Sequence, residues 1–166
     1  MAFLLSKFGR QVGFTIIEFL VVIGVIALLS TLVMGGSHYA KKYAAKKKAY
    51  ADLAEIAKAI DNLALDCGQW PGHQTPYVTC NNDCSNNEIE DLSLPEAGIK
   101  QTDGLFPNWR GPYIQILSKD PWGNNYFLDT DYQIDGQIKA VVGSYGPNGR
   151  GLNEYDDDDI IYIINH

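Results

Sequence analysis

The sequence has few of the side chains that enzymes most often use. Its three histidines, His38, His73 and His166, are scattered, and no candidate nucleophile is paired with His73. An enzyme with a metal in the acidic C-terminal loop would need a nucleophile or a general base beside it, and the candidates left for that role are His166 and His38. The composition therefore argues against an enzyme and favours a structural or binding role.

Cysteine is also scarce, with three residues, Cys67, Cys80 and Cys84. They do not make up a four-ligand zinc site, and the one histidine nearby is His73. In an oxidising compartment one pair could close a loop and leave the third thiol free. The alternative is three free thiols, and the sequence does not decide which two cysteines would pair.

Basic residues are outnumbered by acidic ones, and the net charge is −7. The first thirteen residues contain Lys7 and Arg10 and no acid, so the remainder has 11 basic against 20 acidic residues. Such a body is poorly suited to bind nucleic-acid phosphates, and we expect no nucleic-acid partner. It suits an exported domain or one that binds cations.

Charge is nearly absent from residues 14–34, where Glu18 is the one charged side chain among 21 residues. At about 1.5 Å per residue, a helix of this length spans roughly the 30 Å hydrocarbon core of a bilayer. A buried core helix is the alternative. Lys7 and Arg10 place the first thirteen residues on the cytoplasmic side of the membrane. Five lysines within residues 41–48, on the other side, weaken the evidence for that orientation.

A carboxylate at position 18 is costly inside a membrane unless it is paired. If the chain is cut before Phe14, the new amine could be the partner, in the same chain or in a neighbouring one. A neighbour's amine would favour one register in a polymer. Otherwise Glu18 reaches the lipid headgroups or stays protonated.

The segment GFTIIEFLVVIGVIALLS resembles the prepilin signature of type IV pilins and secretion pseudopilins. The resemblance implies cleavage between Gly13 and Phe14 by a prepilin peptidase, N-methylation of Phe14 and an assembly role for Glu18. It also implies a bacterial inner-membrane protein with a periplasmic domain. The implied partners are membrane lipid, further copies in a helical homopolymer, minor pseudopilins and an inner-membrane assembly platform. Many relatives have a proline where this chain has Gly35-Gly36, and each glycine weakens a helix by about 1 kcal/mol relative to alanine.

The helix is expected to continue to about Leu65, because apolar residues recur with helical spacing. They are Leu53, Ile56, Ala57, Ile60, Leu63 and Ala64. The chain then divides into a leader (1–13), a membrane and assembly helix (14–35), an amphipathic half of the same helix (36–66) and a globular domain (67–166). Residues 67–110 are a loop-rich insert, with a short helix at 88–92.

Three segments rich in β-branched and aromatic residues predict strands at 126–128, 138–142 and 160–164. Asp135-Gly136 is a hairpin turn signal between the first two. The predicted fold is therefore α+β, with a long N-terminal helix packed on a small antiparallel sheet of three strands.

The segment GPYIQILSKDPWGNNYFL resembles a stretch of the major pseudopilin of type II secretion. Asp120-Pro121 and Gly123-Asn124 set tight turns, whatever the family. Type IV pilins of surface pili, which serve adhesion, twitching or DNA uptake, are the alternative. They often carry a disulfide close to the C-terminus, and this chain ends without cysteine. The secretion hypothesis is therefore favoured.

The C-terminal loop has four adjacent acids after the segment SYGPNGRG. Clustered oxygens beside glycine turns suit calcium, although an acidic run is more often a solvated face. Major pseudopilins have a similar loop that binds calcium. The resemblance implies structural calcium ligands at the Tyr145 carbonyl, the Asn148 side chain, Asp158 and Asp159, with Asp156 or Asp157 as substitutes. Asn148 replaces an Asp of the family, which removes one negative charge.

Overall fold

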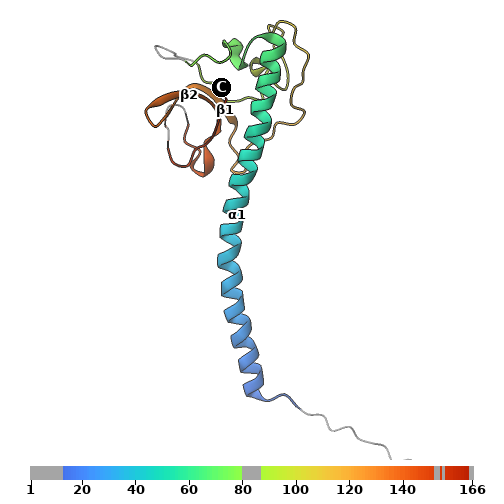
Figure 1. The fold of residues 1–166 in the computed structure, drawn as a ribbon. Helices are drawn as coiled ribbons and strands as arrows, with labels where there is room; N and C mark the ends of the chain where they lie inside the picture. Colours follow the sequence, from blue (N-terminus) through green and yellow to red (C-terminus); the bar gives the residue numbers. More distant parts are fainter. Residues whose placement is uncertain (1–12, 80–86, 152–153, 155, 165–166) are drawn as a thin grey trace, which may run out of the picture. The chain divides into compact units, whose positions relative to one another are not determined.

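A computed structural model of the chain describes residues 13–79, 87–151, 154 and 156–164, and only the backbone of residues 32–36. The chain divides into two compact units, Met1–Lys41 and Lys42–His166. Figure 1 shows its elements, which in chain order are α1 (Ile16–Cys67), η1 (Pro71–His73), η2 (Pro95–Ala97), β1 (Tyr126–Ile134), β2 (Gln137–Ser144), η3 (Gly146–Asn148) and β3 (Ile160–Ile163).

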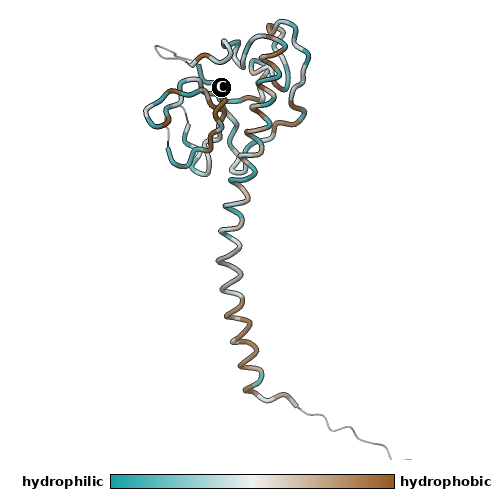
Figure 2. Tube along the Cα trace, in the orientation of Figure 1, coloured by the Kyte–Doolittle hydropathy of each residue, from teal (hydrophilic) through white to brown (hydrophobic). Residues whose placement is uncertain are grey.

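In the first unit, the beginning of α1 leaves its apolar side chains uncovered. Every residue from 13 to 31 is exposed, and Phe14 and Ile16 are 84% and 82% exposed. This part of the helix is predominantly brown, the colour of apolar residues, in Figure 2. Within the described residues, no helix combines the length and hydropathy needed to cross a membrane. The predicted membrane segment, 14–35, includes residues 32–35, whose side chains lie outside that description.

In the second unit, the last part of α1 buries its predicted apolar stripe. All six residues are buried, and Leu53, Ile56, Ile60 and Leu63 are fully enclosed. The helix ends at Cys67, close to the expected end. Gly68, with a φ of 66°, then donates its N–H to the Ala64 carbonyl at 2.8 Å, as glycine commonly does after a helix.

The three predicted strands are confirmed and form one antiparallel sheet in the order β1-β2-β3. Both β1 and β2 extend beyond their apolar centres. Asp135 and Gly136 join them with φ values of 51° and 74°. Ile134 pairs with Gln137, so these are the two central residues of a tight hairpin whose turn needs two positive φ values.

Both faces of the sheet are buried near its centre. One face contributes Tyr126, Leu128, Ala140, Val142 and Ile160 to the core that contains the α1 stripe. The opposite face forms a second cluster from Phe127, Tyr132 and Val141, against which Tyr145 packs. This alternation follows from the two-residue period of a strand. The fold is thus α+β, as predicted.

Strand β1 contains a bulge beside a segment that was predicted to be helical. Asp129 pairs with Val141 and Tyr132 with Lys139, so two residues of β1 face one residue of β2 between these pairs. The predicted short helix at 88–92 is wrong. Ile89 instead exchanges two backbone hydrogen bonds with Leu128, at 2.8 and 2.9 Å. Its side chain packs on the core, a gain that outweighs local helix propensity.

Leu63→Ala should lower the free energy of unfolding by about 2–5 kcal/mol, because it leaves a cavity under the sheet. Leu65→Ala is the matched control, since Leu65 is 80% exposed whereas Leu63 is fully buried. Its effect should stay within about 0.5 kcal/mol. Urea titration of the full chain in detergent, followed by circular dichroism, measures both. Equal losses from the two variants would contradict the packing.

Candidate assembly and cation sites

The predicted cleavage bond lies in exposed chain just before α1. Gly13, Phe14 and Thr15 are exposed and belong to neither helix nor strand. The helix begins at Ile16. The Gly13–Phe14 bond can therefore be reached without unwinding α1.

The start of α1 is fixed by a reciprocal cap between Thr15 and Glu18. Glu18 Oε2 accepts hydrogen bonds from the backbone N–H and the hydroxyl of Thr15, each at 2.8 Å. In return, the Glu18 N–H donates to Thr15 Oγ1 at 3.3 Å. This capping box gives Glu18 a partner that was not among those predicted. The Thr-x-x-Glu spacing is the sequence signal that could have revealed it.

The turn of residues 120–124 is organised by the buried carboxylate of Asp120, which is 5% exposed. Its Oδ1 accepts the backbone N–H groups of Trp122 at 2.9 Å and Asn124 at 2.8 Å. Its Oδ2 accepts the hydroxyl of Ser144, the last residue of β2, at 2.5 Å. These donors compensate for burying a charge. One carboxylate thus joins the predicted turn to the strand that leads into the acidic loop.

The same turn supports the first half of that loop. Asn124 Nδ2 donates to the Gly146 carbonyl at 2.8 Å, and the Gly146 N–H donates to Ser144 Oγ at 3.1 Å. Gly146 has a φ of 62°, and a Cβ there would overlap the carbonyl oxygen of Asp158. Glycine therefore lets the two halves of the loop meet.

The second half of the loop holds Asp156 against Asn148 and Asp159 against Tyr132. Asn148 Nδ2 donates to Asp156 Oδ2, and the Tyr132 hydroxyl donates to Asp159 Oδ2, both at 2.7 Å. Burial raises the pKa of Asp159. Asp159 Oδ1 is enclosed by protein and has no hydrogen-bond partner within the described part of the chain.

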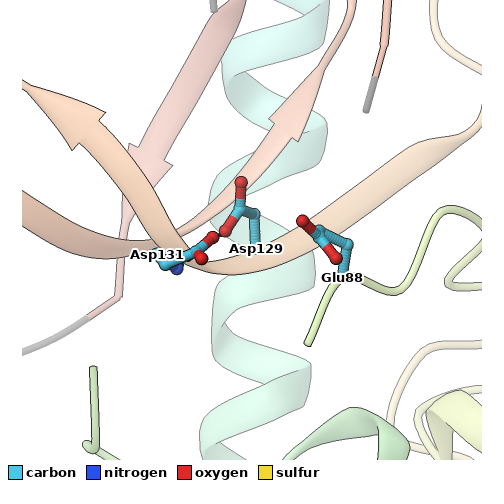
Figure 3. Close-up of side chains that lie close together, drawn as sticks. All are labelled: Glu88, Asp129 and Asp131. Atoms are coloured by element: carbon cyan, nitrogen blue, oxygen red, sulfur yellow. Dashed lines mark hydrogen bonds between the residues drawn. The ribbon is translucent and has the colours of Figure 1, made fainter. Parts of the chain in front are cut away.

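The other predicted ligands surround these contacts. Tyr145 directly precedes η3, and its ring stacks on Phe127 with centroids 4.4 Å apart. Asp158 is half-buried and Asp157 is exposed. The described residues contain one group of three acids in which one oxygen of each side chain lies within 4.8 Å of the other two. It lies outside this loop and consists of Glu88, Asp129 and Asp131 (Figure 3).

The loop nevertheless has residues that fit a hard cation. Its polar side chains offer oxygens, the ligand atoms that calcium prefers. The enclosed Asp159 Oδ1 is a carboxylate oxygen that a cation could satisfy. Asp156, predicted as a substitute, is the acid that contacts Asn148.

The structure describes one of the three cysteines that were candidates for a disulfide. Cys67 is buried and free, with its Sγ 3.8 Å from the hydroxyl oxygen of Tyr113. Burial raises the pKa of this thiol. This structure therefore has no bridge from Cys67. Cys80 and Cys84, either of which could have bridged to Cys67, lie outside the described residues.

Comparison with known proteins bears on nearly the whole chain. Residues 92–162 match the family model described as type II secretion system (T2SS), protein G. The type II secretion system core protein G of Vibrio cholerae is 30% identical over 153 residues, which cover 90% of this chain and 93% of that protein. The core protein G of Escherichia coli K12 is 34% identical, over 72% of each chain.

The chain belongs to the type II secretion system protein G family. A crystal structure of the major pseudopilin from the type 2 secretion system of enterohaemorrhagic Escherichia coli is 25% identical. That match covers 73% of this chain and 84% of that one, with a TM-score of 0.47.

The region that matches the family model helps to distinguish a secretion pseudopilin from a pilin of a surface pilus. Residues 92–162 include the 120–124 turn and the acidic loop but not the Gly13–Phe14 signal. The match to the family model therefore does not rest on the N-terminal motif that pilins and pseudopilins share. It confirms the predicted resemblance to the secretion branch.

Asp120→Ala in this protein G family member should lower the free energy of unfolding by about 2 kcal/mol or more, because it leaves buried donors without an acceptor. Lys119→Ala, at the exposed neighbouring position, is the control and should change it by less than about 0.5 kcal/mol. Urea unfolding of the full chain in detergent tests this. A small, equal effect for both variants would show that Asp120 does not hold the turn.

Proposed function

We propose that this protein G family member is the major pseudopilin of its secretion system, a structural subunit without catalytic activity. Residues 14–35 anchor it in the bacterial inner membrane until it joins a periplasmic fibre that drives protein export. The observation that carries this proposal is the apolar start of α1. From residue 14 to residue 31 nothing in the described chain covers it. So large an apolar surface requires lipid or other subunits around it.

Processing by a prepilin peptidase between Gly13 and Phe14 is part of the proposal. The exposed, non-helical backbone at this bond supports it. Cleavage and N-methylation would leave the Phe14 amine directly before the capping residue, Thr15. The positive charge would then lie close in sequence to the Glu18 carboxylate, which already accepts hydrogen bonds at the helix start.

Glu18 can cap the helix and at the same time bind an amine in the fibre. Both of the hydrogen bonds that it accepts in the described chain go to Oε2, which leaves Oε1 for an amine. In the fibre, we expect that amine to be Phe14 of a neighbouring copy. A charge pair in apolar surroundings is costly when broken, so it penalises other registers.

Calcium bound by the acidic loop is also proposed, in a structural role. Asp159 and Asp156 would hold it together with Asn148, Asp158 and the Tyr145 carbonyl. The cation would reduce repulsion among the adjacent carboxylates and fix the loop beside β1. Further partners are the minor pseudopilins and an inner-membrane assembly platform.

Glu18→Gln should reduce fibre yield at least tenfold while membrane insertion is unchanged. Glutamine can replace glutamate in a capping box but has no negative charge to pair with an ammonium group. Thr15→Ala is the complementary control, because it removes the hydroxyl from the cap and keeps the Glu18 charge. Fibres can be sheared from cells that express the assembly machinery and quantified by immunoblot. Normal yield from Glu18→Gln, or an equal loss from Thr15→Ala, would refute the pairing.

The mature chain should begin at Phe14 and carry one added methyl group at its amine. Mass spectrometry of the N-terminal peptide from the membrane fraction measures this directly. A Gly13→Leu variant should keep the leader, because the small residue before the cut is lost. An intact Met1 in the unmodified chain, or a cut at another bond, would contradict the proposed processing.

Chelation should lower the melting temperature of the full chain in detergent by several degrees, because calcium at 100 times its dissociation constant stabilises the folded state by about 2.7 kcal/mol. Asp159→Asn should bind calcium more weakly at the loop and show a smaller shift. Glu154→Gln, at an exposed position of the same loop that is not a candidate ligand, should respond like the unmodified chain. Identical melting of the unmodified chain with and without chelator would refute a stabilising calcium.

A further inference from the structure

The part of α1 that begins the second unit has a basic and aromatic face. At about 100° per residue, its five members lie within about 140° of the helix circumference. Tyr43 and Tyr50 are 64% and 51% exposed, and Lys47 Nζ lies 5.3 Å from the centroid of the Tyr43 ring. Lys42 and Lys47 are exposed too, and Lys46 is half-buried. We call this surface the lysine–tyrosine face: Lys42, Tyr43, Lys46, Lys47 and Tyr50.

Acids of the described chain do not balance the charge of this face. None of the ion pairs between described residues involves Lys42, Lys46 or Lys47. The next lysine, Lys48, is paired with Asp52. Lys42 and Lys46 are four residues apart, a spacing at which like charges destabilise a helix. An anionic partner would therefore stabilise the face.

The remainder of the chain carries the opposite charge. Residues 41–48 contain five lysines and no acid, whereas residues 49–166 contain 6 basic and 19 acidic residues, a net charge of −13. Complementary charge favours contact between the basic segment of one copy and an acidic surface of another. A contact between two different surfaces can repeat without closing, which produces a helical filament. A second copy is thus the partner that this charge distribution fits.

One acidic segment of the second unit has the complementary character. Residues 87–98 contain four acids and no basic residue. Glu90 and Glu96 are exposed, and neither belongs to an ion pair within the described chain. Leu94, between them in the sequence, is 42% exposed and offers an apolar surface to a tyrosine ring. The segment therefore presents both carboxylates and an apolar side chain.

We propose that the lysine–tyrosine face binds residues 90–96 of a second copy of this chain. The carboxylates of that segment pair with the lysines, and its Leu94 packs on a tyrosine ring. Exposed ion pairs add little affinity, so the contact fixes the register of copies that the apolar part of α1 holds together. The inference rests on the proposed function, because it needs a fibre in which copies of the chain meet.

Anionic lipid is the competing partner, because the face follows the segment that is proposed to anchor the chain in the membrane. In the fibre, however, the subunit has left the bilayer, and other chains must supply the negative charge. A lipid surface needs the lysines alone. A second copy needs Glu90 and Glu96 as well, and this difference decides the experiment.

Charge reversal with rescue tests the contact in cells that express the assembly machinery. Reversing the lysines should reduce the yield of sheared fibres at least tenfold, because like charges then face each other. Reversing the acids, with Glu90→Lys and Glu96→Lys, should do the same. A chain with both sets should recover at least a third of the unmodified yield. The lysine set is Lys42→Glu, Lys46→Glu and Lys47→Glu.

The matched control reverses three exposed lysines outside the face and should change the yield less than twofold. These substitutions are Lys58→Glu, Lys100→Glu and Lys119→Glu. An equal loss from this control would show that net charge alone matters and would overturn the contact. So would a loss from the lysine set with no effect of the acid set and no rescue, which is the pattern expected of lipid binding.

Carbodiimide coupling of unmodified fibres tests the contact without any variant. It should join a lysine of the face to Glu90 or Glu96, detected by mass spectrometry, and the monomer in detergent should give no such product. Fibres without this product overturn the contact and leave the proposed function intact. Absence of fibres from the unmodified chain overturns the proposed function and the contact with it.

Discussion

The second unit depends on the burial of the α1 stripe against one face of a three-stranded sheet. Leu53, Ile60 and Leu63 are enclosed there, and the helix supplies much of the core. A sheet this small still has a second apolar face, around Phe127 and Val141, that must be covered. The chain after β2 passes near it, with the Tyr145 ring stacked on Phe127. The acids of the C-terminal loop are consequently held close to the strands.

Much of this fold could be predicted because its signals are local. The helical spacing of the stripe, the β-rich runs and the Asp135-Gly136 turn each occupy a short stretch of sequence, and the structure contains all three. The segment 88–92 shows where local reasoning fails. Its acids and leucine are compatible with a helix, but Ile89 gains more by pairing with Leu128, nearly 40 residues later. Single-sequence periodicity carries no information about such a partner.

The candidate sites likewise combine local features that the sequence shows with contacts between distant residues that it does not show. The acidic loop and the 120–124 turn were recognisable by composition, and the capping box at Thr15 by its spacing. Their connection was not, because it depends on Ser144 reaching the buried Asp120. Nor could the acids at the bulge be grouped from sequence. Asp129 and Asp131 resemble ordinary strand acids until the bulge and the neighbouring Glu88 are known.

The pKa of Tyr132 depends on the charges of both acidic regions. Its hydroxyl donates to Asp159 of the loop, and it immediately follows Asp131 of the acidic group at the β1 bulge. Burial raises the pKa of this hydroxyl, and the charges of Asp159 and Asp129 raise it further. The hydroxyl of Tyr132 is therefore sensitive to both regions. Neutralising the carboxylates of either one would lower its pKa, because nearby negative charge disfavours the phenolate.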